Sequence, residues 1–181
     1  MPSIYLIESD NPTVLSQAIG LVSHYPYNHL SLSLDDGLFE VYSFGRKKPN
    51  NPIIGGFIQE DFTHPFYSGT KVRIYATEIT EEAFEELENS VQHFKENADA
   101  WHYNFFGLFS ARLQIPWNRE HHFFCSQFVA AVLKDADLLP QTFIPSVSHP
   151  KDVIEAMDSE LVYQGSLWEY PLLADKMLIN Q

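Results

Sequence analysis

The single cysteine of the chain, Cys125, begins an apolar segment with helical spacing. The helical spacing places four apolar side chains on one face, those of Phe128, Val129, Val132 and Leu133. This pattern predicts a helix over residues 123–136 with Cys125 in its first turn. The free N–H groups and the positive dipole end of a helix start favour an anion. We therefore expect a lowered thiol pKa and a nucleophilic thiolate, with the same amides able to hold an oxyanion formed on a carbonyl.

A thiolate nucleophile needs a general base, and His29 is the best candidate among the eight histidines. It begins a predicted strand in which leucines alternate with polar residues, so that it lies on the polar side. A histidine from a sheet that meets a cysteine at a helix start is typical of cysteine hydrolases. His121 and His122 are too close to Cys125 in sequence to reach its side chain readily.

The hairpin over residues 29–44 is the clearest β signal, and Asp36-Gly37 predicts a two-residue turn. With that turn, Ser31 faces Tyr42 and Ser33 faces Glu40. One face of the hairpin is then rich in leucine, and the other carries His29 together with these four residues.

Each of these residues also has a plainer interpretation. A lone cysteine at a helix start is often a small buried packing residue, and a histidine at a strand end is often only hydrogen-bonded. His121, His122 and Cys125 form a weak zinc pattern, because no further ligand pair accompanies them. Residue types and spacing therefore leave catalysis and simple packing both open, and we expect neither a metal nor a cofactor.

Composition limits the class of protein. With 24 acidic and 11 basic residues the net charge is −13. This charge argues against a nucleic-acid partner and against binding to an anionic membrane surface. No apolar run approaches the ~20 residues of a transmembrane helix, so we expect no stable membrane insertion. One cysteine forms no internal disulfide, and the first residues lack the basic start of a signal peptide. These features favour a reduced, cytoplasmic protein.

The chain of 181 residues predicts one domain over residues 1–181, with strands and helices segregated as in an α+β fold. The predicted strands cover residues 3–8, the hairpin 29–44, and residues 71–77 and 161–167. The predicted helices start at Asn11-Pro12, after Thr80, at Trp101, at Phe123 and at Pro150, and residues 45–56 are predicted to be a loop.

The order of these motifs resembles a known family. His29-Leu-Ser-Leu-Ser-Leu, then the segment from Val41 to Arg46, and much later Phe124-Cys125-Ser126-Gln127-Phe128-Val129, are similar to the circularly permuted NlpC-type papain-like cysteine hydrolases. This group includes the YiiX-like proteins and the relatives of lecithin:retinol acyltransferase. In it the histidine strand precedes the cysteine helix, the reverse of the order in papain.

The resemblance implies a papain-like α+β fold, with an antiparallel sheet packed against helices, and a cysteine-dependent amidase, peptidase or acyl-transfer activity. Cys125 matches the nucleophile of the family and His29 its base. A third polar residue orients the histidine in the family; here Tyr42 lies diagonally across from His29, and Glu40 has the better chemistry but needs a bulge. The implied substrates are a peptide, a murein fragment or a lipid or acyl ester.

A second hypothesis is a papain-like binding module that holds a peptide or acyl ligand without turnover. The aromatic residues around Trp101 to Trp117 would suit such a groove, and equally ordinary core packing. A structural protein with an incidental cysteine is the third interpretation. The pKa of Cys125 distinguishes chemistry from binding.

Overall fold

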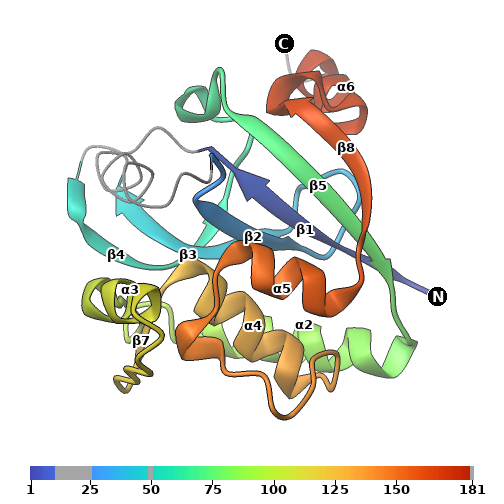
Figure 1. Ribbon diagram of the computed structural model, residues 1–181. Helices are drawn as coiled ribbons and strands as arrows, with labels where there is room; N and C mark the ends of the chain where they lie inside the picture. Colours follow the sequence, from blue (N-terminus) through green and yellow to red (C-terminus); the bar gives the residue numbers. More distant parts are fainter. Residues whose placement is uncertain (11–25, 49–50, 180–181) are drawn as a thin grey trace.

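A six-stranded antiparallel sheet forms the centre of the protein (Figure 1). The computed structural model describes residues 1–10, 26–48 and 51–179. The sheet has the strand order β4-β3-β2-β1-β5-β8, so β4 and β8 are its edges. Its strands are β1 (Ser3–Ser9), β2 (His29–Ser33), β3 (Val41–Lys48), β4 (Asn51–Glu60), β5 (Lys71–Glu78) and β8 (Glu160–Ser166).

Helices cover one face of this sheet, and the remaining elements lie around it. The covering helices are α2 (Glu81–Glu96), α4 (Cys125–Asp135) and α5 (Pro150–Met157), which lie together on one side of the strands in Figure 1. Helix α3 (Phe105–Arg112) lies beside a short parallel pair, β6 (His102–Tyr103) and β7 (His122–Phe123). The other elements are α6 (Pro171–Ile179) and the 3₁₀ turns η1 (Pro65–Tyr67), η2 (Pro145–Val147) and η3 (Leu167–Glu169).

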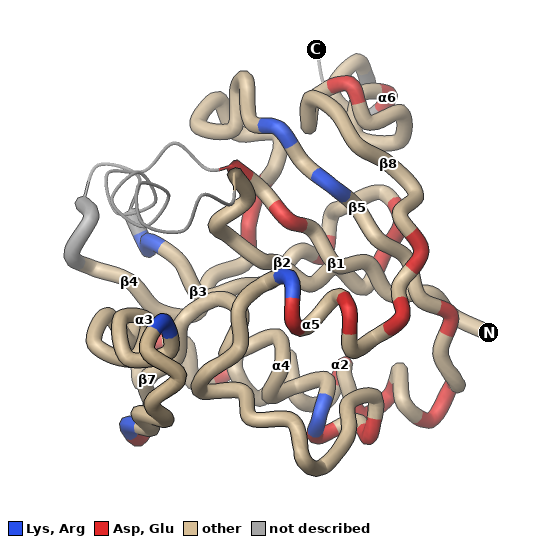
Figure 2. The backbone as a smooth tube through the Cα atoms, viewed as in Figure 1, with Lys and Arg blue, Asp and Glu red and all other residues tan. Residues whose placement is uncertain are grey.

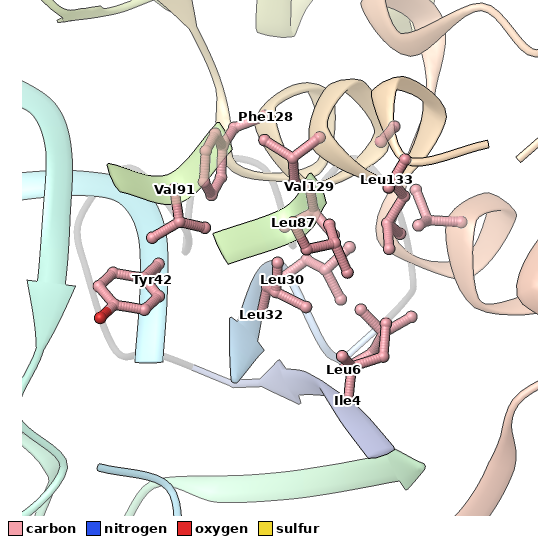
Figure 3. Packing of buried hydrophobic residues seen from close by; sticks show 14 of the residues in the cluster. Ile4, Leu6, Leu30, Leu32, Tyr42, Leu87, Val91, Phe128, Val129 and Leu133 are labelled. Carbon is pink, nitrogen blue, oxygen red and sulfur yellow. The ribbon is translucent and has the colours of Figure 1, made fainter. Parts of the chain in front are cut away.

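The larger hydrophobic core lies between the sheet and these three helices. Period-2 alternation on the strands and the apolar stripe of each helix bring the two layers together. Phe128 of α4 is fully buried and packs against Phe44 of β3, with ring centroids 5.2 Å apart. Figure 3 shows side chains of α4 and α2 meeting those of β1, β2 and β3. This core fixes the start of α4 against the sheet.

A smaller core covers the opposite face of the sheet. There Ile7 of β1, Val41 of β3, and Val72 and Ile74 of β5 pack under residues of η1, η3 and α6. A strand buried on both faces cannot show clean apolar–polar alternation, because both sides need apolar residues. This explains the unbroken Ile-Tyr-Leu-Ile run of β1.

Most of the predicted elements are confirmed. Strands β1, β5 and β8 and helices α4 and α5 form where the sequence predicts them, within one or two residues at each end, and α2 begins after Thr80 as predicted. Thr80 caps α2 as predicted, because its Oγ1 accepts a hydrogen bond from the N–H of Ala83 at 3.2 Å. The predicted helix after Asn11-Pro12 lies outside the described residues, and the predicted helix at Trp101 begins only at Phe105, after β6.

Three predictions in and after the hairpin are wrong. Residues 34–40, not a two-residue turn, join β2 to β3, because Asp35 Oδ1 accepts hydrogen bonds from the N–H groups of Phe39 and Glu40 at 2.8 and 2.7 Å. The register is also shifted by one residue, so Tyr42 pairs with Leu32 and not with Ser31. The predicted loop over residues 45–56 belongs largely to β3 and β4, which pair as far as Lys48↔Asn51.

None of the helices among the described residues is long and apolar enough to cross a bilayer.

Candidate active site

Cys125 is the first residue of α4 and is only 3% exposed. The residue before it, Phe124, is extended (φ −106°, ψ 170°) and makes no side-chain cap hydrogen bond within the described residues. The first-turn N–H groups of α4 are therefore not taken up by a capping side chain, unlike those of α2. Together with the helix dipole, they favour negative charge at Cys125.

The Cys125 sulfur faces strand β2 as well as its own helix. The backbone N–H groups of Leu30 and Ser126 both donate hydrogen bonds to it. Strands β2 and β3 pair only at Leu32↔Tyr42 and Ser33↔Val41, so the β2 edge at Leu30 is open toward α4. Helix α4 contacts both strands. The start of the helix thus lies where the two strands stop pairing.

His29 brings the imidazole to this cysteine from the first position of β2. Its side chain is 13% exposed, and its Nε2 lies 3.0 Å from Oε1 of Glu60. Because Nε2 faces Glu60, Nδ1 is the ring nitrogen left for the hydrogen bond that His29 shares with the Cys125 sulfur. The three groups therefore form a line of thiol, imidazole and carboxylate.

Glu60 is the last residue of β4 and is 3% exposed. Its Oε1 also accepts a hydrogen bond from the hydroxyl of Ser31 at 2.5 Å, and its Oε2 accepts one from the hydroxyl of Tyr67 at 2.6 Å. A buried carboxylate is costly unless it is paired and hydrogen-bonded, and here both oxygens have partners. The side chain is held in one orientation by three different elements, β2, η1 and its own strand.

The charges of the three groups support each other. Burial alone would raise the pKa of Glu60, but the charge of His29 and the hydrogen bonds from His29 and Ser31 outweigh it and lower this pKa to about 2. Burial likewise would lower the pKa of His29, but the charge of Glu60 and the bonds to Cys125 and Glu60 raise it to about 10. At neutral pH the imidazole is therefore protonated.

The pKa of the Cys125 thiol is likewise set by burial on one side and by nearby charge and hydrogen bonds on the other. Burial raises the pKa of Cys125, but the hydrogen bond and charge of His29 and the N–H groups of Leu30 and Ser126 lower it below its ordinary value overall. A thiolate–imidazolium pair is the charge state that these contacts favour. Such a pair is the reactive form of a cysteine nucleophile.

Tyr103 lies near enough to Cys125 for the charge of the thiolate to act on its phenol. Burial and the nearby charge of Cys125 raise the pKa of its phenol well above the ordinary value, so the hydroxyl stays neutral and able to donate a hydrogen bond. Tyr103 packs closely on β4 at Gly55, because a Cβ at that glycine would lie 2.8 Å from Cβ of Tyr103. Tyr103 was not among the predicted site residues.

The structure brings Cys125 and His29 together but not the two predicted third residues. Tyr42 is 2% exposed and packs in the larger core, with its ring stacked on that of Phe57 at 6.0 Å between centroids (Figure 3). The one-residue shift in register turns it to the helix-covered face, away from the polar side. Glu40 is exposed in the connection before β3. Glu60 occupies the position expected for them.

Sequence reasoning missed Glu60 because residues 45–56 contain glycine, proline and asparagine and were predicted to be a loop. The available signal was the apolar pair Phe57-Ile58, which is separated from Glu60 by Gln59 alone. Phe57 pairs with Phe44, and Glu60 with Val41. A third strand places Glu60 on the face of Ser31 and His29 only in the observed register, in which Val41 pairs with both Ser33 and Glu60.

His121 and His122, the histidines nearest to Cys125 in the sequence, do not join the site. His122 of β7 pairs with His102 of β6, and the ring of His121 lies against Trp101 at 5.1 Å between centroids. Within residues 1–10, 26–48 and 51–179, no group of three or more His, Cys, Asp or Glu side chains is arranged to hold a metal ion.

Comparisons of the chain with family models, with curated proteins and with solved structures found no match.

Proposed function

We propose that this chain is a cysteine-dependent hydrolase or acyltransferase of papain-like architecture, with the permuted chain order of the NlpC-type enzymes. Cys125 is the nucleophile, His29 the acid and base, and Glu60 the residue that orients His29. The observation that carries the proposal is the continuous line from Cys125 at a helix start, through His29, to the buried carboxylate of Glu60. This order of thiol, imidazole and carboxylate, drawn from three separate elements, supports acyl-transfer chemistry.

The chemistry follows from the charge states. The Cys125 thiolate attacks the carbonyl carbon of an amide or ester, a C–S bond forms, and the carbonyl electrons move to oxygen. The first-turn N–H groups of α4 stabilise this oxyanion. The C–N or C–O bond then breaks, and the imidazolium of His29 gives its proton to the leaving amine or alcohol. A thioester remains on Cys125.

The second half-reaction reverses these roles. Neutral His29 takes a proton from water, or from an acceptor alcohol or amine, which attacks the thioester carbon. The C–S bond breaks, the acid or the transferred acyl product leaves, and the thiolate–imidazolium pair is restored. Glu60 keeps its negative charge throughout and holds the ring of His29 in place. No metal or cofactor takes part in this scheme.

The proposed substrate class is an amide, thioester or ester carbonyl in a peptide, a murein fragment or a lipid. The cytoplasmic location favoured by the sequence stays a prediction, and it directs the first screen to intracellular amides and esters.

The deciding experiment is the pH dependence of Cys125 alkylation by iodoacetamide, in the wild type and in His29→Ala. An unperturbed thiol titrates near pH ~8.5, so half-maximal labelling well below that value is expected for the wild type. His29→Ala should lose this low-pH reactivity. Ordinary thiol behaviour in both proteins would contradict the proposal and favour the second hypothesis, a binding module without turnover. Because Cys125 is the only cysteine, all labelling reports on this site.

A further inference from the structure

Helix α3 differs from an ordinary surface helix, because it buries small residues and exposes large apolar ones. Its buried residues are Gly107 and Ala111, whereas Phe106 and Phe109 are 73% and 61% exposed. A surface helix normally turns its large apolar side chains to the core and its small or polar ones outward. The two phenylalanines therefore contribute contact area to the outside of the molecule and not to the core.

The segment after α3 continues this exposed apolar surface. Every residue from 112 to 120 is exposed, including Leu113 at 70%, Ile115 at 52% and Trp117 at 52%. On the other side, α3 lies against η2, beside which Ile144 is 52% exposed. We call the exposed apolar residues of α3 and its following segment the α3 face: Phe106, Phe109, Leu113, Ile115 and Trp117.

Hydrogen bonds hold the α3 face in place. Asn104, only 2% exposed, caps α3 by accepting a hydrogen bond from the N–H of Gly107 at 2.8 Å, and its Nδ2 donates to the carbonyl of Trp117 at 3.4 Å. Nε2 of Gln127 donates a hydrogen bond to Oδ1 of Asn118 at 3.5 Å. Gln127 is on α4, two positions after Cys125. The segment that carries the exposed side chains is thus hydrogen-bonded to Asn104 and to α4 close to Cys125.

The charge pattern indicates what covers this face. The chain carries −13 overall, yet residues 100–119 contain no Asp or Glu and include Arg112 and Arg119. Figure 2 shows most acidic positions on other parts of the molecule and basic positions at α3 and near β7, where the acidic Glu120 follows Arg119. Exposed Trp, Phe and Leu with Arg at the margin is the composition of protein surfaces that lie in a lipid interface.

We propose that the α3 face docks on a lipid surface with zwitterionic headgroups. The high exposure of its side chains means that they project from the molecule, which suits shallow insertion between headgroups better than contact with a complementary groove. The negative charge on the rest of the protein disfavours anionic lipid. Docking would bring Cys125 to the lipid–water boundary, but it does not depend on the chemistry proposed above.

Vesicle sedimentation tests this proposal, with phosphatidylcholine vesicles and with vesicles that also contain phosphatidylglycerol. The wild type is expected to sediment with phosphatidylcholine vesicles, with a blue shift of tryptophan emission that Trp117→Phe removes. Leu113→Ser and Phe109→Ser should each weaken binding roughly tenfold. Leu178→Ser is the matched control, because Leu178 on α6 is also 70% exposed and should leave binding unchanged. Circular dichroism melting checks that each variant folds.

Three results would overturn the proposal. The first is no sedimentation with either vesicle. The second is binding only to the anionic vesicles that added salt reverses, because this would identify a purely electrostatic contact. The third is a dimer in analytical ultracentrifugation that Leu113→Ser dissociates without any vesicle binding, which would identify a second copy as the occupant. Cys125→Ser protein should bind vesicles like the wild type, so a failure of docking and a failure of the catalytic proposal are distinguishable.

Discussion

The carboxylate of Glu60 lies 3.0 Å from Nε2 of His29, although the two residues are 31 positions apart and stand on strands separated by β3. The His29–Glu60 pair is buried, and each partner moves the pKa of the other toward its charged form. The properties of the Cys125 thiol therefore depend on a residue that does not touch it.

Replacing Glu60 should weaken the thiolate through His29. In Glu60→Gln the pKa of His29 falls, because the carboxylate that raises it is gone, and the pKa of Cys125 rises in turn. Alkylation of Cys125 at pH 6 is expected to slow by roughly tenfold or more. The measurement is the iodoacetamide rate against pH. Glu40→Gln is the control, because Glu40 is exposed and should leave the rate unchanged; equal effects of both variants would refute a specific role for Glu60.

The hydroxyl of Tyr67 should act as a positioning group for the same carboxylate. Tyr67→Phe keeps the ring but removes the hydrogen bond to Oε2 of Glu60, and Ser31→Ala removes one of those to Oε1. Each variant should shift the alkylation profile in the direction of Glu60→Gln but by less, because the carboxylate keeps its other partners. A fall in melting temperature without any change in the profile would mean that these hydroxyls only support the fold.

The His29–Glu60 pair should stabilise the fold within a defined pH window. The lowered pKa of Glu60 gives stability that is complete above pH 4.5 and lost as the pH falls toward about 2. The raised pKa of His29 gives stability that is complete below pH 6.5 and lost as the pH rises toward about 10. The free energy of unfolding of the wild type should therefore exceed that of Glu60→Gln most between pH 4.5 and 6.5. Urea titrations across this range measure it, and a constant difference would contradict the pairing.

Gly56 should be among the least replaceable glycines of the chain. A Cβ at this position would lie 2.2 Å from the carbonyl oxygen of Trp101, so Gly56→Ala forces the segment before β6 away from β4 at a cost of about 2 kcal/mol. Gly69→Ala is the comparison: its φ of +80° is strained for alanine, but nothing lies within 4 Å, and the cost should be about 1 kcal/mol. Chemical denaturation ranks the two, and the opposite order would contradict this packing.

The sequence predicted the two residues whose local context is strong. Cys125 lies in a long apolar helical pattern, and His29 begins a strand of alternating leucines, so both elements are visible from periodicity alone. The third residue was not predictable in the same way, because β4 contains paired glycines that serve close contact with residues 101 and 103 and read locally as a loop. Strand pairing, a long-range property, decides whether Glu60 or Tyr42 faces His29.

The turn prediction failed for a related reason. Asp36-Gly37 is a strong local hairpin signal, but the side chain of Asp35 binds two N–H groups further along and holds a wider connection. That single carboxylate changes the register by one residue and reverses the faces of β3. Ser31 and Ser33 are buried because α6 and η3 cover the second face of the sheet. This layer was not predicted from the sequence.

Strand β4 is at the edge of the sheet, and among the described strands of that sheet it pairs only with β3. Edge strands open in local fluctuations at a lower free energy than the centre of a sheet. Opening of β4 would carry Glu60 away from His29 while the core between the sheet and α4 stays intact. On heating, the thiol should therefore lose its enhanced reactivity at a lower temperature than that of the cooperative melting of the core.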